Sequence, residues 1–183
     1  MATNRIVAIA VAAAALLAAV PGRAEVVSSG EGHFFVRQQI VANVPAQRAW
    51  KALTEEIGRW WSPVHTWSGN SRNLSLEARP GGCFCERLPG GGVRHMEVVY
   101  VKPPELLRLE GGLGPLQEQA LAGAMTWTLV ADGDSCTIGL VYRVAGGVEG
   151  GLAGWAPGVD SVLELQIGRF KAWIETGNPE IQP

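Results

Sequence analysis

Residues 56–63 read Glu-Ile-Gly-Arg-Trp-Trp-Ser-Pro, and residues 79–84 read Arg-Pro-Gly-Gly-Cys-Phe. The tryptophan pair ends a short helical segment, because Pro63 cannot continue a helix. The Pro-Gly-Gly turn then opens a run of strands. These two stretches mark where the chain changes from helix to sheet.

Upstream of the tryptophan pair, the sequence predicts a first strand and a helix. Residues 33–44 alternate and are rich in β-formers, which is typical of a strand. Pro45 then opens a helix, since proline is tolerated in a first turn. Its buried face is predicted from apolar residues at helical spacing, namely Ala49, Trp50, Leu53 and Ile57.

Downstream, the chain is predominantly β-like as far as residue 144. Glycine-rich turns at residues 89–92 and 132–134 are typical of hairpins. The predicted strands are 74–78, 81–88, 93–101, 105–110, 124–130 and 136–144. The chain therefore carries the pattern of an antiparallel sheet.

The C-terminal segment changes to a helical period. Its apolar stripe consists of Val159, Val162, Leu163, Ile167, Phe170, Trp173 and Ile174. Gly177 and Pro179 supply the residues that end a helix. We predict one long amphipathic helix over residues 159–176 that covers the sheet, which makes the fold class α+β.

These signals together resemble the SRPBCC (START-like) superfamily, in particular its polyketide-cyclase-like branch and the homologues of heat-shock-protein ATPase activators. The residues that carry the resemblance are Ile40–Pro45 with Ala49-Trp50, Trp60-Trp61, Pro80-Gly81-Gly82, Pro103-Pro104-Glu105 and Arg169–Trp173. None of them is a catalytic motif. The resemblance implies a helix-grip fold, in which a curved antiparallel sheet of six or seven strands wraps the long C-terminal helix and two short helices follow the first strand.

The resemblance also implies an internal apolar cavity and a small hydrophobic ligand. It covers most of residues 33–177, which we expect to form a single domain, followed by a tail at residues 178–183. Fold alone says little about function, because this superfamily includes carriers, cyclases, receptors and chaperone cofactors.

The first 24 residues are typical of a secretory signal peptide. Arg5 precedes an apolar run at residues 6–20, and Gly22-Arg23-Ala24 fits a cleavage site. The run is short for a membrane span, which needs about 20 residues, although an uncleaved anchor is the alternative. We expect cleavage after Ala24, a flexible leader at residues 25–32, and a periplasmic or secreted protein without a later membrane span.

Charge and composition exclude some classes of partner. The chain has 15 Lys and Arg residues against 17 Asp and Glu residues, and Arg5 and Arg23 would leave with the signal peptide. A weakly acidic surface without basic runs argues against nucleic-acid binding, because such binding depends on phosphate neutralisation. The sequence gives no oligomeric state.

The three cysteines do not suggest a metal site. Cys83 and Cys85 are two residues apart on a predicted strand, where we expect buried, unpaired thiols rather than a strained bridge. Zinc sites need four ligands, and a Cys-x-Cys without a second pair is a weak match. We expect no metal and no cofactor.

Aromatic and apolar side chains are the candidates for ligand contact. Trp60, Trp61 and Trp67 fall in an irregular segment that could border a cavity, or could cap the short helices. The predicted ligand-binding set is Trp60, Trp61, His65, Trp67, Met96, Val98, Tyr100, Trp127, Tyr142 and Leu163. The sequence pattern alone does not distinguish residues that line a cavity from residues that only pack under the long helix.

Three polar residues are weak candidates for catalysis, namely His65, Glu86 and His95. If Leu88 pairs with Val93, Glu86 faces His95 across a hairpin. A carboxylate that orients an imidazole suits general-base catalysis, but it is also what an exposed cross-strand pair looks like. We expect the exposed pair, with Glu97 on the same polar face.

The sequence leaves three functions open. The first is an exported, non-enzymatic binding protein for a small hydrophobic molecule. The second is a cyclase- or hydratase-like enzyme that acts in the same cavity, with His65 as the first suspect. The third is a protein-interaction module at the cell envelope.

Overall fold

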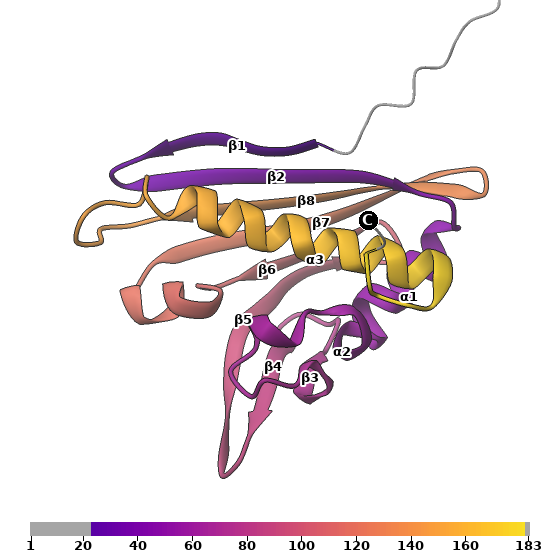
Figure 1. Ribbon diagram of the computed structural model, residues 1–183, viewed down its shortest axis with the longest axis horizontal. Helices are drawn as coiled ribbons and strands as arrows, with labels where there is room; N and C mark the ends of the chain where they lie inside the picture. The colour runs from indigo at the N-terminus through magenta and orange to yellow at the C-terminus, as the bar shows by residue number, and fades with distance from the viewer. Residues whose placement is uncertain (1–22, 182–183) are drawn as a thin grey trace, which may run out of the picture.

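A computed structural model describes residues 23–181 as one curved antiparallel sheet covered by a long helix (Figure 1). The eight strands lie in the order β1-β2-β8-β7-β6-β5-β4-β3. Their bounds are β1 Arg23–Gly30, β2 His33–Ala42, β3 Leu74–Leu76, β4 Cys83–Leu88, β5 Gly91–Lys102, β6 Leu106–Glu110, β7 Ala122–Asp132 and β8 Ser135–Ala145. The predicted α+β helix-grip fold is confirmed, with eight strands where six or seven were expected.

The helices occupy the positions that the sequence predicts. After β2 come α1 Ala46–Glu55 and α2 Ile57–Trp60, and the chain closes with α3 Ala156–Thr176. Short 3-10 turns lie at η1 Pro63–His65, η2 Ser71–Asn73 and η3 Gly114–Gln119. In Figure 1, α3 runs across the sheet, and α1 and α2 lie near the C-terminal half of α3. Within residues 23–181 no helix has both the length and the apolarity that crossing a membrane requires.

Residues 25–30 depart from the prediction. They were expected in a flexible leader, but they form most of β1, which pairs antiparallel with β2. Backbone hydrogen bonds to a neighbouring strand stabilise an edge strand even where its own side-chain pattern is weak. The predicted signal peptide lies outside the described residues except for Arg23 and Ala24, which are the first two residues of β1.

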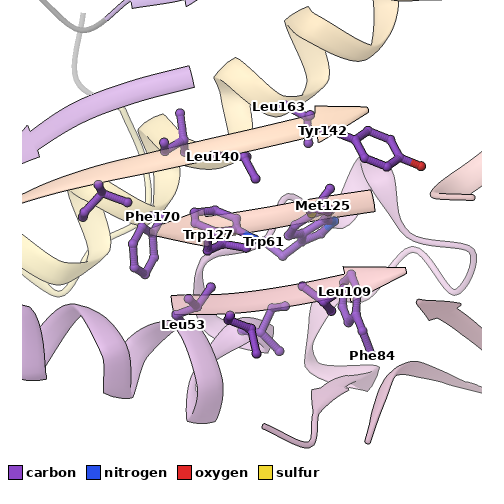
Figure 2. Packing of buried hydrophobic residues seen from close by; sticks show 14 of the residues in the cluster. Leu53, Trp61, Phe84, Leu109, Met125, Trp127, Leu140, Tyr142, Leu163 and Phe170 are labelled. Atoms are coloured by element: carbon purple, nitrogen blue, oxygen red, sulfur yellow. The ribbon is translucent and has the colours of Figure 1, made fainter. Parts of the chain in front are cut away.

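The core fills the space between the sheet and the helices. At its centre Trp60 of α2 contacts Phe170 of α3 and Trp127 of β7, with ring centroids 4.9 Å and 6.1 Å away. Trp60 is fully buried, and its indole N–H donates to the Ala52 carbonyl of α1 at 2.9 Å. The predicted helix stripe faces the core, since Leu163, Ile167, Phe170 and Ile174 are buried. Figure 2 shows Phe170 beside Trp127.

The cysteines also differ from the prediction. Cys83 and Cys85 form a disulfide at the start of β4, whereas unpaired thiols were expected. The two side chains share one face of the strand, and this brings them within bonding reach. Cys136 is a buried free thiol, as expected of a small apolar side chain.

Candidate ligand cavity

A cavity of about 700 Å³ lies between the N-terminal half of α3 and one end of the sheet. Its walls are mostly apolar and come from loops as well as from regular elements. The lining residues are Trp61, Val64, His65, Thr66, Trp67, Leu74, Phe84, His95, Leu113, Gly114, Pro115, Leu116, Tyr142, Glu149, Gly150, Gly151, Gly154, Trp155, Gly158, Val159, Val162 and Leu163. Ligand sites are commonly concave, apolar and of this size.

One wall is aromatic. The rings of Trp61 and Phe84 meet edge to face at a centroid distance of 5.5 Å, and Phe84 lies 5.1 Å from the imidazole of His95. Figure 2 shows Trp61 and Phe84 within the buried cluster, close to Leu109. Such rings offer flat apolar surface to a bound molecule.

The loop after α2 is held against α3 by Gln166. This buried glutamine accepts the backbone N–H of Ser62 at 2.9 Å, and its amide nitrogen lies 3.0 Å from Nδ1 of His65. Arg169, one turn further along α3, donates to the carbonyl of Trp60 at 2.9 Å. Both tryptophans belong to the buried core, and Trp61, which is 4 % exposed, also lines the cavity.

Further along, the same loop is held by the carboxylate of Glu86. One oxygen accepts the backbone N–H of Ser68 at 2.6 Å, and the other accepts that of Trp67 at 3.0 Å and lies 3.0 Å from Nε2 of His95. Glu86 is 1 % exposed and His95 is 5 % exposed. The pair is therefore buried in the cavity wall, and the predicted exposed pair is wrong.

Two features explain this error: Glu86 shares the inner face of β4 with the buried Phe84, and the β4–β5 hairpin contains a bulge. Leu88 pairs with Gly91, not with Val93, and the register shifts between Phe84 and Cys85, which leaves His95 as the extra residue. A bulge adds a residue to one strand and redirects its side chains. Glu97 stays on the outer side, where it pairs with Arg94 instead of joining Glu86.

Burial and hydrogen bonding set the charges of this pair. Burial acts to raise the pKa of Glu86, but the hydrogen bonds from Ser68, Trp67 and His95 outweigh it and hold the pKa below its usual value. Burial lowers the pKa of His95 by more than the adjacent carboxylate raises it. At neutral pH the wall therefore holds an ionised carboxylate and a neutral imidazole.

Tyr142 anchors another part of the wall. Its hydroxyl donates to the Gly111 carbonyl at 2.9 Å and accepts the Leu113 N–H at 3.0 Å. Burial raises its pKa to about 12, so the phenol stays neutral. Because both bonds go to the backbone of residues 111–113, the hydroxyl fixes the loop that leads to Leu116.

The structure brings together six of the residues singled out from the sequence. Trp61, His65, Trp67, Tyr142 and Leu163 line the cavity, and so does His95. Trp60, Met96, Val98 and Trp127 are buried in the core instead, and Tyr100 is 47 % exposed with Arg108 above its ring. Whether any of them binds a ligand stays a prediction.

Two lining segments were missed from the sequence. They are the turn at residues 113–116 and the glycine-rich stretch at residues 149–158. The sequence of both segments has the composition of a loop. They become part of the cavity wall only because the fold brings them against the sheet and α3. Among the described residues, no group of three or more His, Cys, Asp or Glu side chains is arranged to hold a metal ion.

Comparison with known families and structures places this geometry in context. The profile of the family described as "Polyketide cyclase / dehydrase and lipid transport" matches residues 33–175. No curated protein matches the chain.

Several solved structures share the fold. A conserved protein of unknown function from Enterococcus faecalis is 12 % identical, with a TM-score of 0.60, and the match covers 87 % of this chain and 80 % of that one. The Aha1 protein of Colwellia psychrerythraea is 14 % identical, with a TM-score of 0.58 over 78 % of this chain and 97 % of that one. CalU16 of Micromonospora echinospora is 16 % identical, with a TM-score of 0.52 over 87 % and 86 %. At such identities the likeness is one of fold.

Proposed function

Because the chain belongs to the polyketide cyclase / dehydrase and lipid transport family, we propose that it binds a small hydrophobic molecule in the cavity beneath α3. The observation that carries the proposal is a space of about 700 Å³ walled mainly by Trp, Phe, Leu, Val and Gly residues. Burial of apolar ligand surface there would be favoured by roughly 25 cal/mol per Å².

A steric variant at Gly158 tests this proposal. Gly158 lines the cavity in the first turn of α3, and a Cβ added there meets no heavy atom within 4 Å. A Gly158→Trp side chain should therefore occupy ligand space without disturbing the fold. We expect the neutral dye N-phenyl-1-naphthylamine to bind the wild type saturably and the variant about tenfold more weakly, a loss of ~1.4 kcal/mol.

Gly158→Ala is the matched control. It adds one methyl group in the same open space and favours the helix, so binding should stay near that of the wild type. Thermal unfolding of all three proteins checks that folding is intact. Unsaturable dye binding by the wild type, unchanged in Gly158→Trp, would contradict the proposal.

The Glu86–His95 pair supports a second candidate function. A neutral imidazole oriented by a buried carboxylate is an arrangement that general-base catalysis uses. In this candidate, His95 removes a proton from a carbon acid bound in the cavity. Deuterium exchange from D2O into 2-acetylnaphthalene would test it: exchange above the buffer rate that disappears in His95→Phe supports catalysis, and exchange at the buffer rate rejects it.

We further infer that the protein acts outside the cytosol. The apolar run at residues 6–20 is followed by small residues at positions suited to signal cleavage. The Cys83–Cys85 disulfide supports the same inference, because disulfides persist mainly in oxidising compartments.

A further inference from the structure

Nδ1 of His95 is a buried polar atom without a hydrogen-bond partner. Among the side chains described for residues 25–181, it is the one buried N or O atom for which the structure shows no partner. His95 lines the cavity and is 5 % exposed. Buried polar groups are nearly always paired, so an orphan beside a cavity needs an explanation.

The neighbouring contacts define which chemistry this atom offers. Nε2 lies 3.0 Å from the ionised Glu86 carboxylate, which accepts hydrogen bonds only, so Nε2 carries the proton. In a neutral imidazole the other nitrogen is then a bare lone pair. Nδ1 is therefore an acceptor, and the group that would satisfy it is a donor such as a hydroxyl.

The charges around the cavity further restrict the chemical class of the ligand. Among the described lining residues there is no lysine and no arginine, and the one carboxylate is that of the exposed Glu149. Behind the wall, Glu86 adds a buried negative charge that no described lysine or arginine pairs with. A carboxylate or phosphate group in this cavity would lose its hydration without meeting a cation, which is costly.

We propose that the cavity selects a neutral apolar molecule with a hydroxyl group, a phenol or an alcohol, whose O–H donates to Nδ1 of His95. The assignment rests on the proposed function as a ligand-binding protein. The aromatic rings of Trp61 and Phe84 beside His95 favour a flat ring system next to the hydroxyl. Nδ1 is shielded from solvent in the structure, so the donor reaches it when neighbouring side chains part to admit the ligand.

A matched set of naphthalenes tests the assignment by calorimetric titration at pH 7. We expect 2-naphthol to bind the wild type roughly tenfold more tightly than 2-methoxynaphthalene, which has the same ring and no donor. Naphthalene-2-carboxylate should bind more weakly than either. In His95→Phe the preference for 2-naphthol should disappear while 2-methoxynaphthalene still binds.

His33→Phe is the control, because His33 is exposed on β2 and does not line the cavity. It should keep the preference for the hydroxyl. Equal affinity of the wild type for 2-naphthol and its methyl ether would overturn the inference and leave the proposed function standing. Two other results would also overturn the inference alone. One is tightest binding of naphthalene-2-carboxylate, and the other is a preference for 2-naphthol that survives in His95→Phe. Failure of all three compounds to bind would overturn the proposed function as well.

Nitrogen NMR of the wild type provides a readout that does not depend on the folding of a variant. Saturation with 2-naphthol should shift the ¹⁵N resonance of His95 Nδ1, because an acceptor nitrogen responds to a new donor. Saturation with 2-methoxynaphthalene should leave it in place. An Nδ1 resonance that stays fixed with 2-naphthol would overturn the inference.

Discussion

A single carboxylate organises one side of the cavity. Glu86 accepts hydrogen bonds from two backbone N–H groups and from His95, and no lysine or arginine of the described chain forms an ion pair with it. Three neutral donors are thus what keeps the carboxylate ionised inside the protein. The arrangement ties β4, β5 and the loop at residues 61–70 to one charged group.

The pH dependence of stability should report on this group. The folded protein holds the pKa of His95 below its ordinary value of 6.5, so the unfolded chain binds more protons as the pH falls through that value. The pKa of Glu86 is likewise held below 4.5, which favours unfolding again at lower pH. We therefore expect the free energy of unfolding to fall as the pH decreases from 7 to 5, and further below 4.5.

Chemical denaturation over pH 4–8 measures this dependence, with His95→Gln as the comparison. Gln has an amide donor where Nε2 of His95 meets Glu86, but it does not titrate. The decrease between pH 7 and pH 5 should be smaller in the variant. A wild-type stability that is flat from pH 7 to pH 5, or one that rises, would show that His95 is not held neutral.

At the scale of elements, α3 contributes Leu163, Ile167, Phe170 and Ile174 to the buried core. Phe170 is fully buried between Trp60 and Trp127. Phe170→Ala should lower the free energy of unfolding by about 3–5 kcal/mol, because it removes apolar contact and leaves a cavity. Urea denaturation measures the loss.

Ser161→Ala is the control on the same helix. Ser161 is exposed, so its replacement should change the free energy of unfolding by no more than about 0.5 kcal/mol. A Phe170→Ala protein as stable as this control would mean that the helix does not pack its apolar stripe against the sheet.

The elements predicted from the sequence are those with a strong repeating pattern. The period of α3, the alternation of β2 and β8, and the proline after the tryptophan pair each follow from local chemistry. Strand β1 was missed because Glu25–Gly30 lacks clear alternation and owes its form to pairing with β2.

The site was harder to predict than the fold. Trp61 and Trp67 line the cavity, and they were singled out because aromatic residues in a loop are conspicuous. Trp127 lies in the core instead, because core and cavity faces carry the same residue types. The burial of His95 depends on a bulge that shifts the register by one residue, and no side-chain pattern marks that shift. Glycines that line a cavity, such as Gly158, leave no trace in hydropathy.

At the scale of the whole molecule, export makes a further prediction. If residues 1–24 are a cleaved signal peptide, the mature chain begins at Glu25 and keeps six of the residues of β1, Glu25–Gly30. N-terminal sequencing of protein from the cell envelope or the medium should therefore read Glu-Val-Val-Ser-Ser-Gly. A cytosolic protein that begins at Met1 would contradict the prediction.

The pairing of β2 with β8 joins the two ends of the domain. His33 lies opposite Ala145, and Ala42 lies opposite Cys136, so β2 has its main partner only after nearly all the sheet has been synthesised. Contacts between such distant residues close slowly, because a long loop must be ordered first. A ribosome-bound chain that has not yet reached residue 145 therefore cannot complete the sheet. If the protein is exported, as we propose, the chain can be translocated before the sheet closes.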